Sequence, residues 1–331
     1  MRLENFQNFF KKIPWLKVAL FLLIFLCFLL STFHEEYPDE YDSLVGGLYI
    51  TQGKLPYRDW FQHHQPLAYV LAGALLSFVG QSFVRFRIFL ALVFFALNGG
   101  LYLLLKKRFK QSSLGFYLVY LFLLALSLTY FWGQMLLADT LAAYLIIPAY
   151  TFLLLHQFDE DKFSTRDLLI FSLLTFFAWL SSLSYLFLLA GLYFYALYRY
   201  FSSEHKKKIR FRKSLKKAII VLALPYFLFF LYLVLTGSLK DWYFANVFYN
   251  QRYYIYNYPK PIGAPINPLR YGLIIAHDFF NNFFPLLGGV KDFAFHDPFN
   301  IASWSSVVVF IILLLLKKKF AFLLPFLSVL I

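Results

Sequence analysis

Five carboxylates lie within eight positions near the start of this chain, and at that density they could supply a general base or ligands for a cation. They are Glu35, Glu36, Asp39, Glu40 and Asp42. Held together they repel one another, so the cluster needs a cation or a chemical task; the alternative is a solvated acidic loop. Asp39 could also cap a helix that begins after Pro38.

Groups that could bind an anion follow the acidic cluster. Arginine suits bidentate contact with phosphate, and histidine adds a donor whose charge depends on pH. For each side chain alone, an interfacial residue that reaches towards water is an equally good interpretation. The candidates are Arg58, His63, His64, Arg85 and Arg87, with Tyr57 as a further substrate contact.

The adjacent histidines do not predict a zinc site. Neighbouring histidines usually point apart, and His63 and His64 have no His-x-x-x-His or cysteine partner. A divalent cation on the carboxylates stays open, although their spacing does not indicate one. We therefore expect no metal ligands and name no certain cofactor.

Two further segments carry candidate groups. Asp139 lies between apolar runs, where a carboxylate at a membrane edge is either functional or the cap of a helix that begins at Thr140. Residues 241–258 are rich in tyrosine and asparagine, which is typical of a sugar-binding lid or of an interfacial aromatic belt. Arg252 and Lys260 are weaker candidates for substrate contact there.

The elements that position these residues are membrane helices. Of 331 residues, 61% are hydrophobic and only 15% are charged, which a water-exposed surface cannot carry. We predict an all-α polytopic membrane protein, and the segment 66–80 is too short for a span and reads as a juxtamembrane helix. The nine predicted spans are 13–33, 88–105, 114–132, 140–156, 167–182, 183–200, 218–236, 302–316 and 320–331.

The net charge of +14 reflects how basic residues are distributed between the two sides of a membrane, and it does not indicate binding to nucleic acid. If 66–80 does not cross, 22 of the 31 lysines and arginines fall on the side of the N-terminus. That bias predicts a cytoplasmic N-terminus and two long outer loops, 34–87 and 237–301. We treat 1–331 as one transmembrane domain, and because it ends inside an apolar run we expect a C-terminally truncated chain.

The order of motifs in the first outer loop resembles the GT-C superfamily of membrane glycosyltransferases. The nearest branch looks like glycosyltransferase family 39, the protein O-mannosyltransferase, aminoarabinose transferase and RgtA/B/C/D-like group. The resemblance covers roughly residues 10–240. It rests on Asp39-Glu40, Gly53-Lys54-Leu55-Pro56-Tyr57-Arg58-Asp59, His63-His64-Gln65-Pro66-Leu67, Gly80 and Arg85, and departs from relatives at Gln65-Pro66.

This resemblance implies an inverting transfer of a sugar from a polyprenyl-phosphate carrier to an acceptor on the outer face of the cell membrane. Asp39 matches the catalytic carboxylate, Glu40 would orient the acceptor or a metal, and Asp139 matches a second acidic position. His64 and Arg85 match positions that meet the donor phosphate. The acceptor could be a lipid, a glycan or a protein.

Two other classes of function stay open. A secondary transporter or lipid flippase would place ionisable residues at mid-bilayer, whereas the carboxylates here lie at the ends of the predicted spans. A non-catalytic membrane assembly factor could share the fold. No P-loop, dinucleotide-binding fingerprint or nucleophile elbow occurs, so nucleotide-dependent chemistry is unsupported.

Overall fold

The computed structural model describes residues 14–33, 36–109, 117–118, 120–121, 124–125, 128, 133–158, 163–204 and 208–254. These residues form helices and no strand, which confirms the predicted all-helical class for this part of the chain. The helices are α2 (Pro14–Ser31), α3 (Pro38–Thr51), α4 (Leu67–Val79), α5 (Phe83–Phe109), α7 (Ala138–Phe158), α8 (Thr165–Ser181), α9 (Leu186–Glu204), α10 (Lys208–Leu235), α11 (Leu239–Tyr243) and the π-helix η3 (Phe244–Tyr254).

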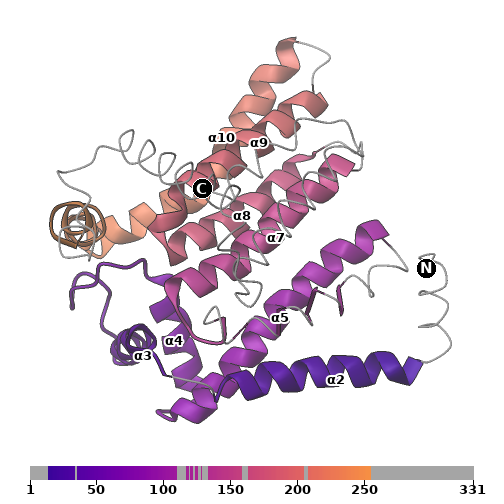
Figure 1. Cartoon of the computed structure of the whole chain (residues 1–331). Helices are drawn as coiled ribbons and strands as arrows, with labels where there is room; N and C mark the ends of the chain where they lie inside the picture. The colour runs from indigo at the N-terminus through magenta and orange to yellow at the C-terminus, as the bar shows by residue number, and fades with distance from the viewer. Residues whose placement is uncertain are drawn as a thin grey trace, which may run out of the picture.

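The long helices pack into one bundle (Figure 1). Helix α8 contacts α7, α9 and α10, and α5 joins α7 to α2. Side chains inside the bundle close hydrogen bonds that lipid cannot satisfy: Thr175 donates to the hydroxyl of Tyr193 over 2.7 Å, which lies 2.9 Å from the hydroxyl of Tyr226. These contacts connect α8, α9 and α10.

Two described helices are long and apolar enough to cross a membrane, over Phe83–Leu104 and Ser214–Leu235. Both coincide with predicted spans. The predicted spans 13–33, 140–156, 167–182 and 183–200 also coincide with helices, namely α2, α7, α8 and α9. The predicted spans 302–316 and 320–331, and most of 114–132, lie outside the described residues.

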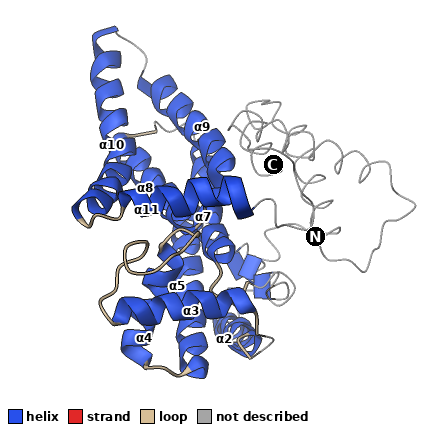
Figure 2. Cartoon of the chain, turned by 90° about the vertical axis from the view of Figure 1, so that its left-hand side faces the viewer, coloured by secondary structure: helices blue, strands red, loops and turns tan. Residues whose placement is uncertain are grey.

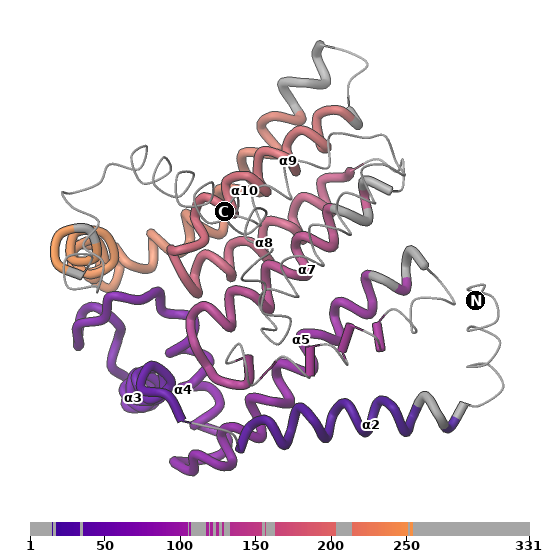
Figure 3. Tube along the Cα trace, viewed as in Figure 1, coloured from indigo at the N-terminus to yellow at the C-terminus, as the bar shows by residue number. Residues whose placement is uncertain are grey.

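The segment 66–80 forms a short helix, as predicted. Helix α4 has 13 residues and is therefore about 20 Å long, shorter than the ~30 Å hydrocarbon core. It packs along α3, a second short helix, at one end of the bundle (Figure 2). The π-helix η3, orange in Figure 1, lies at the same end. The chain between α3 and α4 passes close to η3 (Figure 3). The two predicted outer loops thus meet.

Helices α3 and α4 approach closely because small residues face each other. A β-carbon at Gly47 would lie 2.6 Å from that of Ala72 and 2.8 Å from the backbone nitrogen of Gly73. Both neighbours are rigid parts of α4, so the helices would have to separate. The close contact fixes the face of α3 that carries the acidic residues.

We expect Gly47→Ala to lower stability by about 1–3 kcal/mol through overpacking. The matched control is Gly99→Ala in α5, where no heavy atom lies within 4 Å of the added β-carbon and alanine favours the helix. Thermal unfolding of both variants in detergent measures the difference. Equal unfolding temperatures for the two variants would contradict the close contact.

Candidate active site

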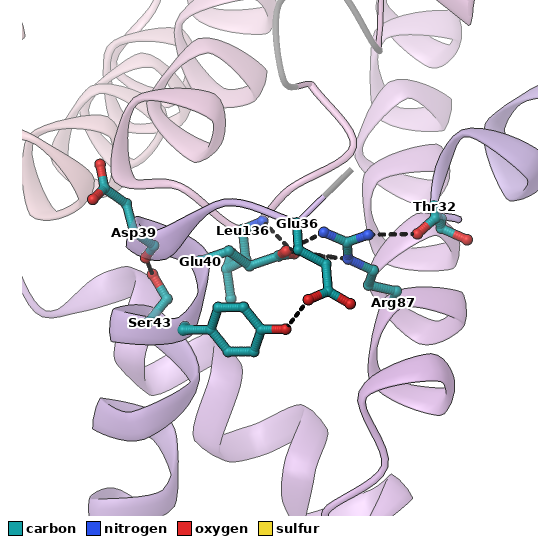
Figure 4. Close-up of polar contacts among 8 residues, drawn as sticks. Thr32, Glu36, Asp39, Glu40, Ser43, Arg87 and Leu136 are labelled. Carbon is teal, nitrogen blue, oxygen red and sulfur yellow. Dashed lines mark hydrogen bonds and ion pairs between the residues drawn. The ribbon is translucent and has the colours of Figure 1, made fainter. Parts of the chain in front are cut away.

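The first turn of α3 sends its two acidic side chains in different directions (Figure 4). Tyr37 precedes the helix, Pro38 stands at its start, and Asp39 and Glu40 occupy the first turn, where negative charge complements the helix dipole. Asp39 is exposed, whereas Glu40 is 0% exposed. Asp39 therefore lies inside the helix start and does not cap it.

Glu40 is a buried partner of Arg87. The Nε atom of Arg87 donates to its carboxylate over 3.1 and 3.3 Å, and Nη2 makes a further contact. Arg87 also donates to the carbonyl of Thr32 over 2.8 Å, and the backbone nitrogen of Leu136 lies 3.4 Å from Glu40. The pair joins α3 to α5, to the end of α2 and to the segment before α7.

This geometry corrects two expectations. A carboxylate with no exposed surface offers no face to an acceptor or a metal, and Glu40 is instead paired with Arg87. Arg87 is 3% exposed and neutralises Glu40, so it is not available as a phosphate ligand. Glu40 and Arg87 could contribute to catalysis only by holding Asp39 in place.

Asp42 is a second carboxylate at the surface of α3, and the sequence pattern alone does not distinguish it from the other acidic residues of the cluster. It accepts hydrogen bonds from the amide of Gln62 over 3.0 Å and from the hydroxyl of Tyr69 over 2.8 Å. Burial, together with the nearby charges of Asp42 and Asp39, raises the pKa of the Tyr69 hydroxyl, which keeps it a donor. The i, i+3 spacing of Asp39 and Asp42 was the available signal, once α3 is known to be a helix.

His63 and His64 lie against each other, contrary to the expectation that they point apart. Their ring centroids are 4.0 Å apart, and His63 also contacts the ring of Tyr249 in η3 at 5.8 Å. The backbone of His64 accepts from the Tyr57 hydroxyl and donates to Gln62. Among the described residues, no three potential metal-ligating side chains gather.

Burial and the neighbouring His64 lower the pKa of His63 to about 4, although the charge of Asp42 opposes the shift. A folded-state pKa below the ordinary 6.5 means that the unfolded chain binds more protons between these values. Stability should therefore fall as pH drops from about 6.5 towards about 4. We expect the unfolding temperature of the wild type to fall more between about pH 7 and about pH 5 than that of His63→Gln; equal falls would contradict this.

The segment 53–59 folds back on itself. Arg58 makes two 2.9 Å contacts with Asp59, whose carboxylate also accepts from the backbone nitrogen of Leu55 over 2.7 Å. These bonds lower the pKa of Asp59 to about 2. Arg58 therefore already has a carboxylate partner, and a donor phosphate would have to compete with it.

Tyr57 adopts a left-handed backbone conformation at φ 70°, which is uncommon for a bulky residue. Its side chain is buried, and burial raises the pKa of its hydroxyl, which donates to the carbonyl of His64 over 2.9 Å. Strained residues of this kind persist where the surroundings fix them, often at functional sites. Tyr57 thus couples segment 53–59 to the histidine pair.

The remaining predicted residues are spread around this end of the bundle. Arg85 is exposed in the first turn of α5, with its guanidinium 3.9 Å from the β-carbon position of Gly80. Asp139 is exposed in the first turn of α7, so it does not cap a helix starting at Thr140. Its carboxylate lies near enough to the hydroxyl of Tyr185 to interact with it electrostatically. Arg252 is exposed in η3, and Lys260 lies outside the described residues.

An apolar cavity of about 250 Å³ opens beside segment 53–57. Its wall combines this segment with the C-terminal ends of α8 and α10, and the cationic side chain of Lys54 borders it. Lys54 lies over the ring of Tyr49 at 4.4 Å. The lining residues are Ile50, Gly53, Lys54, Leu55, Pro56, Tyr57, Pro66, Val70, Leu180, Phe229 and Tyr232.

No family model, curated protein or solved structure matches this chain. The chemistry of the site therefore has to be read from its own geometry. It combines an exposed carboxylate, Asp39, with a second one held by donors, Asp42, a largely neutral histidine and an apolar cavity with a bordering lysine. Such a set could accept a proton from a hydroxyl beside a bound amphipathic molecule.

Proposed function

We propose that this protein is a GT-C-like membrane glycosyltransferase that moves a sugar from a polyprenyl-phosphate carrier to an acceptor on the outer face of the membrane. In this proposal the full set of nine predicted helices crosses the bilayer and the N-terminus is cytoplasmic. Asp39 is the general base, and Asp139 is the second acidic group of the site. The acceptor is a lipid, a glycan or a protein.

The observation that carries the proposal is the apolar cavity between the G-K-L-P-Y-R-D segment and the ends of α8 and α10. An isoprenoid chain needs an apolar wall that is continuous with membrane helices, and Ser214–Leu235 is one of the two described helices that are long and apolar enough to cross a membrane. The carrier phosphate needs a cation beside Asp39, and the exposed Arg85 is the cation that the order of motifs predicts for it. A solvated acidic loop gives no reason for this combination.

The positions of Ile50 and Asp39 on α3 determine how far apart the cavity and the Asp39 carboxylate lie. Ile50 lines the cavity and Asp39 lies eleven residues earlier, which is about 17 Å along a helix. The anomeric carbon is bonded directly to the carrier phosphate, so both would have to lie beside Asp39 for it to act as the base, and the isoprenoid chain would run along α3, past Asp42, to the cavity. The acceptor hydroxyl would approach from the exposed side of Asp39 and lose its proton there.

The test is sugar transfer from a panel of polyprenyl-phosphate sugars in membranes that contain the protein, with and without a chelator. Val70→Trp should fill the cavity and weaken use of the lipid-linked donor by about tenfold or more in kcat/KM. The control is Val45→Trp, since Val45 is similarly exposed, 46% against 48% for Val70, but lies outside the cavity. Wild-type membranes that transfer no sugar from any donor would refute the proposal and favour a test of lipid transport.

A further inference from the structure

The segment between α3 and α4 meets α11 and η3 along a seam defined by Gln65, Trp242, Asn246 and Asn250, and Trp60 lies in the same segment, next to Phe61. The indole of Trp242 donates to the amide oxygen of Gln65 over 3.5 Å, and Asn250 donates to the carbonyl of His63 over 3.0 Å. The ring of Tyr249 packs edge-on against Phe61 at 5.0 Å. Two segments almost 180 positions apart are thus joined mainly by neutral side chains.

Among the described residues, four buried polar atoms at or beside this seam have no hydrogen-bond partner. They are the indole nitrogen of Trp60, the amide nitrogen of Gln65 and the amide oxygens of Asn246 and Asn250. Gln65 is 1% exposed and Asn246 is 4% exposed, so bulk solvent does not satisfy them. Buried groups are normally paired, because an unmade bond costs free energy. Their concentration in one seam indicates a missing partner.

The unpaired atoms are complementary in kind. The segment between α3 and α4 presents two donors, and η3 presents two acceptors. A hydroxyl group both donates and accepts, so one hydroxyl can bridge a donor on one side to an acceptor on the other. All four groups are neutral, and a charged ligand would be buried there without a counter-charge. Tyr249, which is partly exposed beside Phe61, adds an aromatic ring on which a sugar ring can stack.

The seam has a structural means of opening. Helix α11 and η3 follow α10 through Gly237, which adopts a left-handed φ of 71° and has no heavy atom within 4 Å of a β-carbon position. η3 is an eleven-residue π-helix, a rare conformation that is frequent at functional sites. Movement about this turn would expose the four atoms together.

We propose that this seam binds a neutral, polyhydroxylated sugar, whose hydroxyls complete the bonds of Trp60, Gln65, Asn246 and Asn250 as η3 closes over it. The inference depends on the proposed function only for the identity of the group to which the sugar is attached. It narrows the substrate class to neutral hexoses and pentoses, and it excludes uronic acids and amino sugars at this position.

The test is binding of methyl glycosides to the purified protein in nanodiscs, followed by tryptophan fluorescence and by hydrogen exchange of residues 239–254. Neutral hexosides or pentosides should shift the emission in a saturable way and slow exchange in η3, whereas methyl glucuronide and methyl glucosaminide should not. Asn246→Leu and Gln65→Leu should each weaken binding by about tenfold. Gln134→Leu is the control, because both amide atoms of Gln134 are also buried and unpaired but lie outside the seam.

The outcomes separate this inference from the proposed function. Saturable binding that depends on Asn246 supports the seam even where no sugar transfer occurs. Transfer that depends on Asp39, with no binding of any neutral glycoside or with equal binding of charged ones, overturns the seam and leaves the enzyme. Hydrogen exchange of the wild-type protein with each glycoside tests the inference without any variant. The test therefore stays decisive if Asn246→Leu or Gln65→Leu fails to fold. Competition with the lipid-linked donor supports the seam as the site of the donor sugar, and competition with the acceptor supports it as the site of the acceptor sugar.

Discussion

Asp39→Asn is expected to lower the rate of sugar transfer by about 10²- to 10⁴-fold, which is the usual contribution of a positioned general base. The amide keeps the size of the side chain but cannot take the acceptor proton. Because Asp39 is exposed, the change should leave the unfolding temperature almost unaltered. The measurement is single-turnover transfer from the lipid-linked donor, which separates chemistry from binding.

Asp42→Asn is the matched comparison for this prediction. It makes the same chemical change three residues later on α3, at a carboxylate that Gln62 and Tyr69 already hold. An asparagine can still accept from both donors through its amide oxygen, so we expect less than about a tenfold loss. A large loss in Asp42→Asn with an active Asp39→Asn would transfer the role of base to Asp42.

Glu40→Ala is expected to destabilise the protein by about 3–5 kcal/mol, because it leaves the buried guanidinium of Arg87 without its counter-charge. Thermal unfolding in detergent measures the loss. Glu36→Ala is the control: Glu36 is an exposed carboxylate of the same cluster, and its removal should cost about 0.5 kcal/mol or less.

A double replacement separates charge from packing at this pair. Glu40→Leu combined with Arg87→Met removes both charges and keeps apolar volume, so it should recover most of the stability lost in Glu40→Ala. If the pair positions Asp39, the double variant should fold and yet transfer sugar more slowly than the wild type. A double variant as unstable as Glu40→Ala would show that the buried charges are not the source of the effect.

The sequence predicted the coarse organisation because hydrophobic length is a local property. The run at 66–80 could be recognised as too short for a span from its own residues, and α4 has that length. The exposure of Asp39 and the burial of Glu40 are not local. They depend on the register of α3 against α4, set by Gly47, and on Arg87, which follows 47 residues later.

The contacts of the outer residues were the least predictable part. In the sequence, Asp42 was only one of five carboxylates. The hydrogen bonds from Gln62 and Tyr69 distinguish it from the others. The partner of Arg58 is its own neighbour, Asp59, although the sequence pattern predicted a phosphate contact for Arg58. The histidine rings lie together because the chain packs them against Tyr249, nearly 190 positions away. Periodicity and motif spacing carry no information about such distant partners.

The Glu40–Arg87 pair also sets an order for the assembly of this protein during its synthesis. Glu40 contacts the backbone of Leu136, which leaves the ribosome 96 residues after it, and Arg87 reaches back 55 residues to Thr32. A buried charge is costly near lipid until its partners are present. Nascent chains stalled before Leu136 should therefore keep α3 accessible to protease at the membrane surface, and the acidic turn should become protected only once the segment that precedes α7 has emerged.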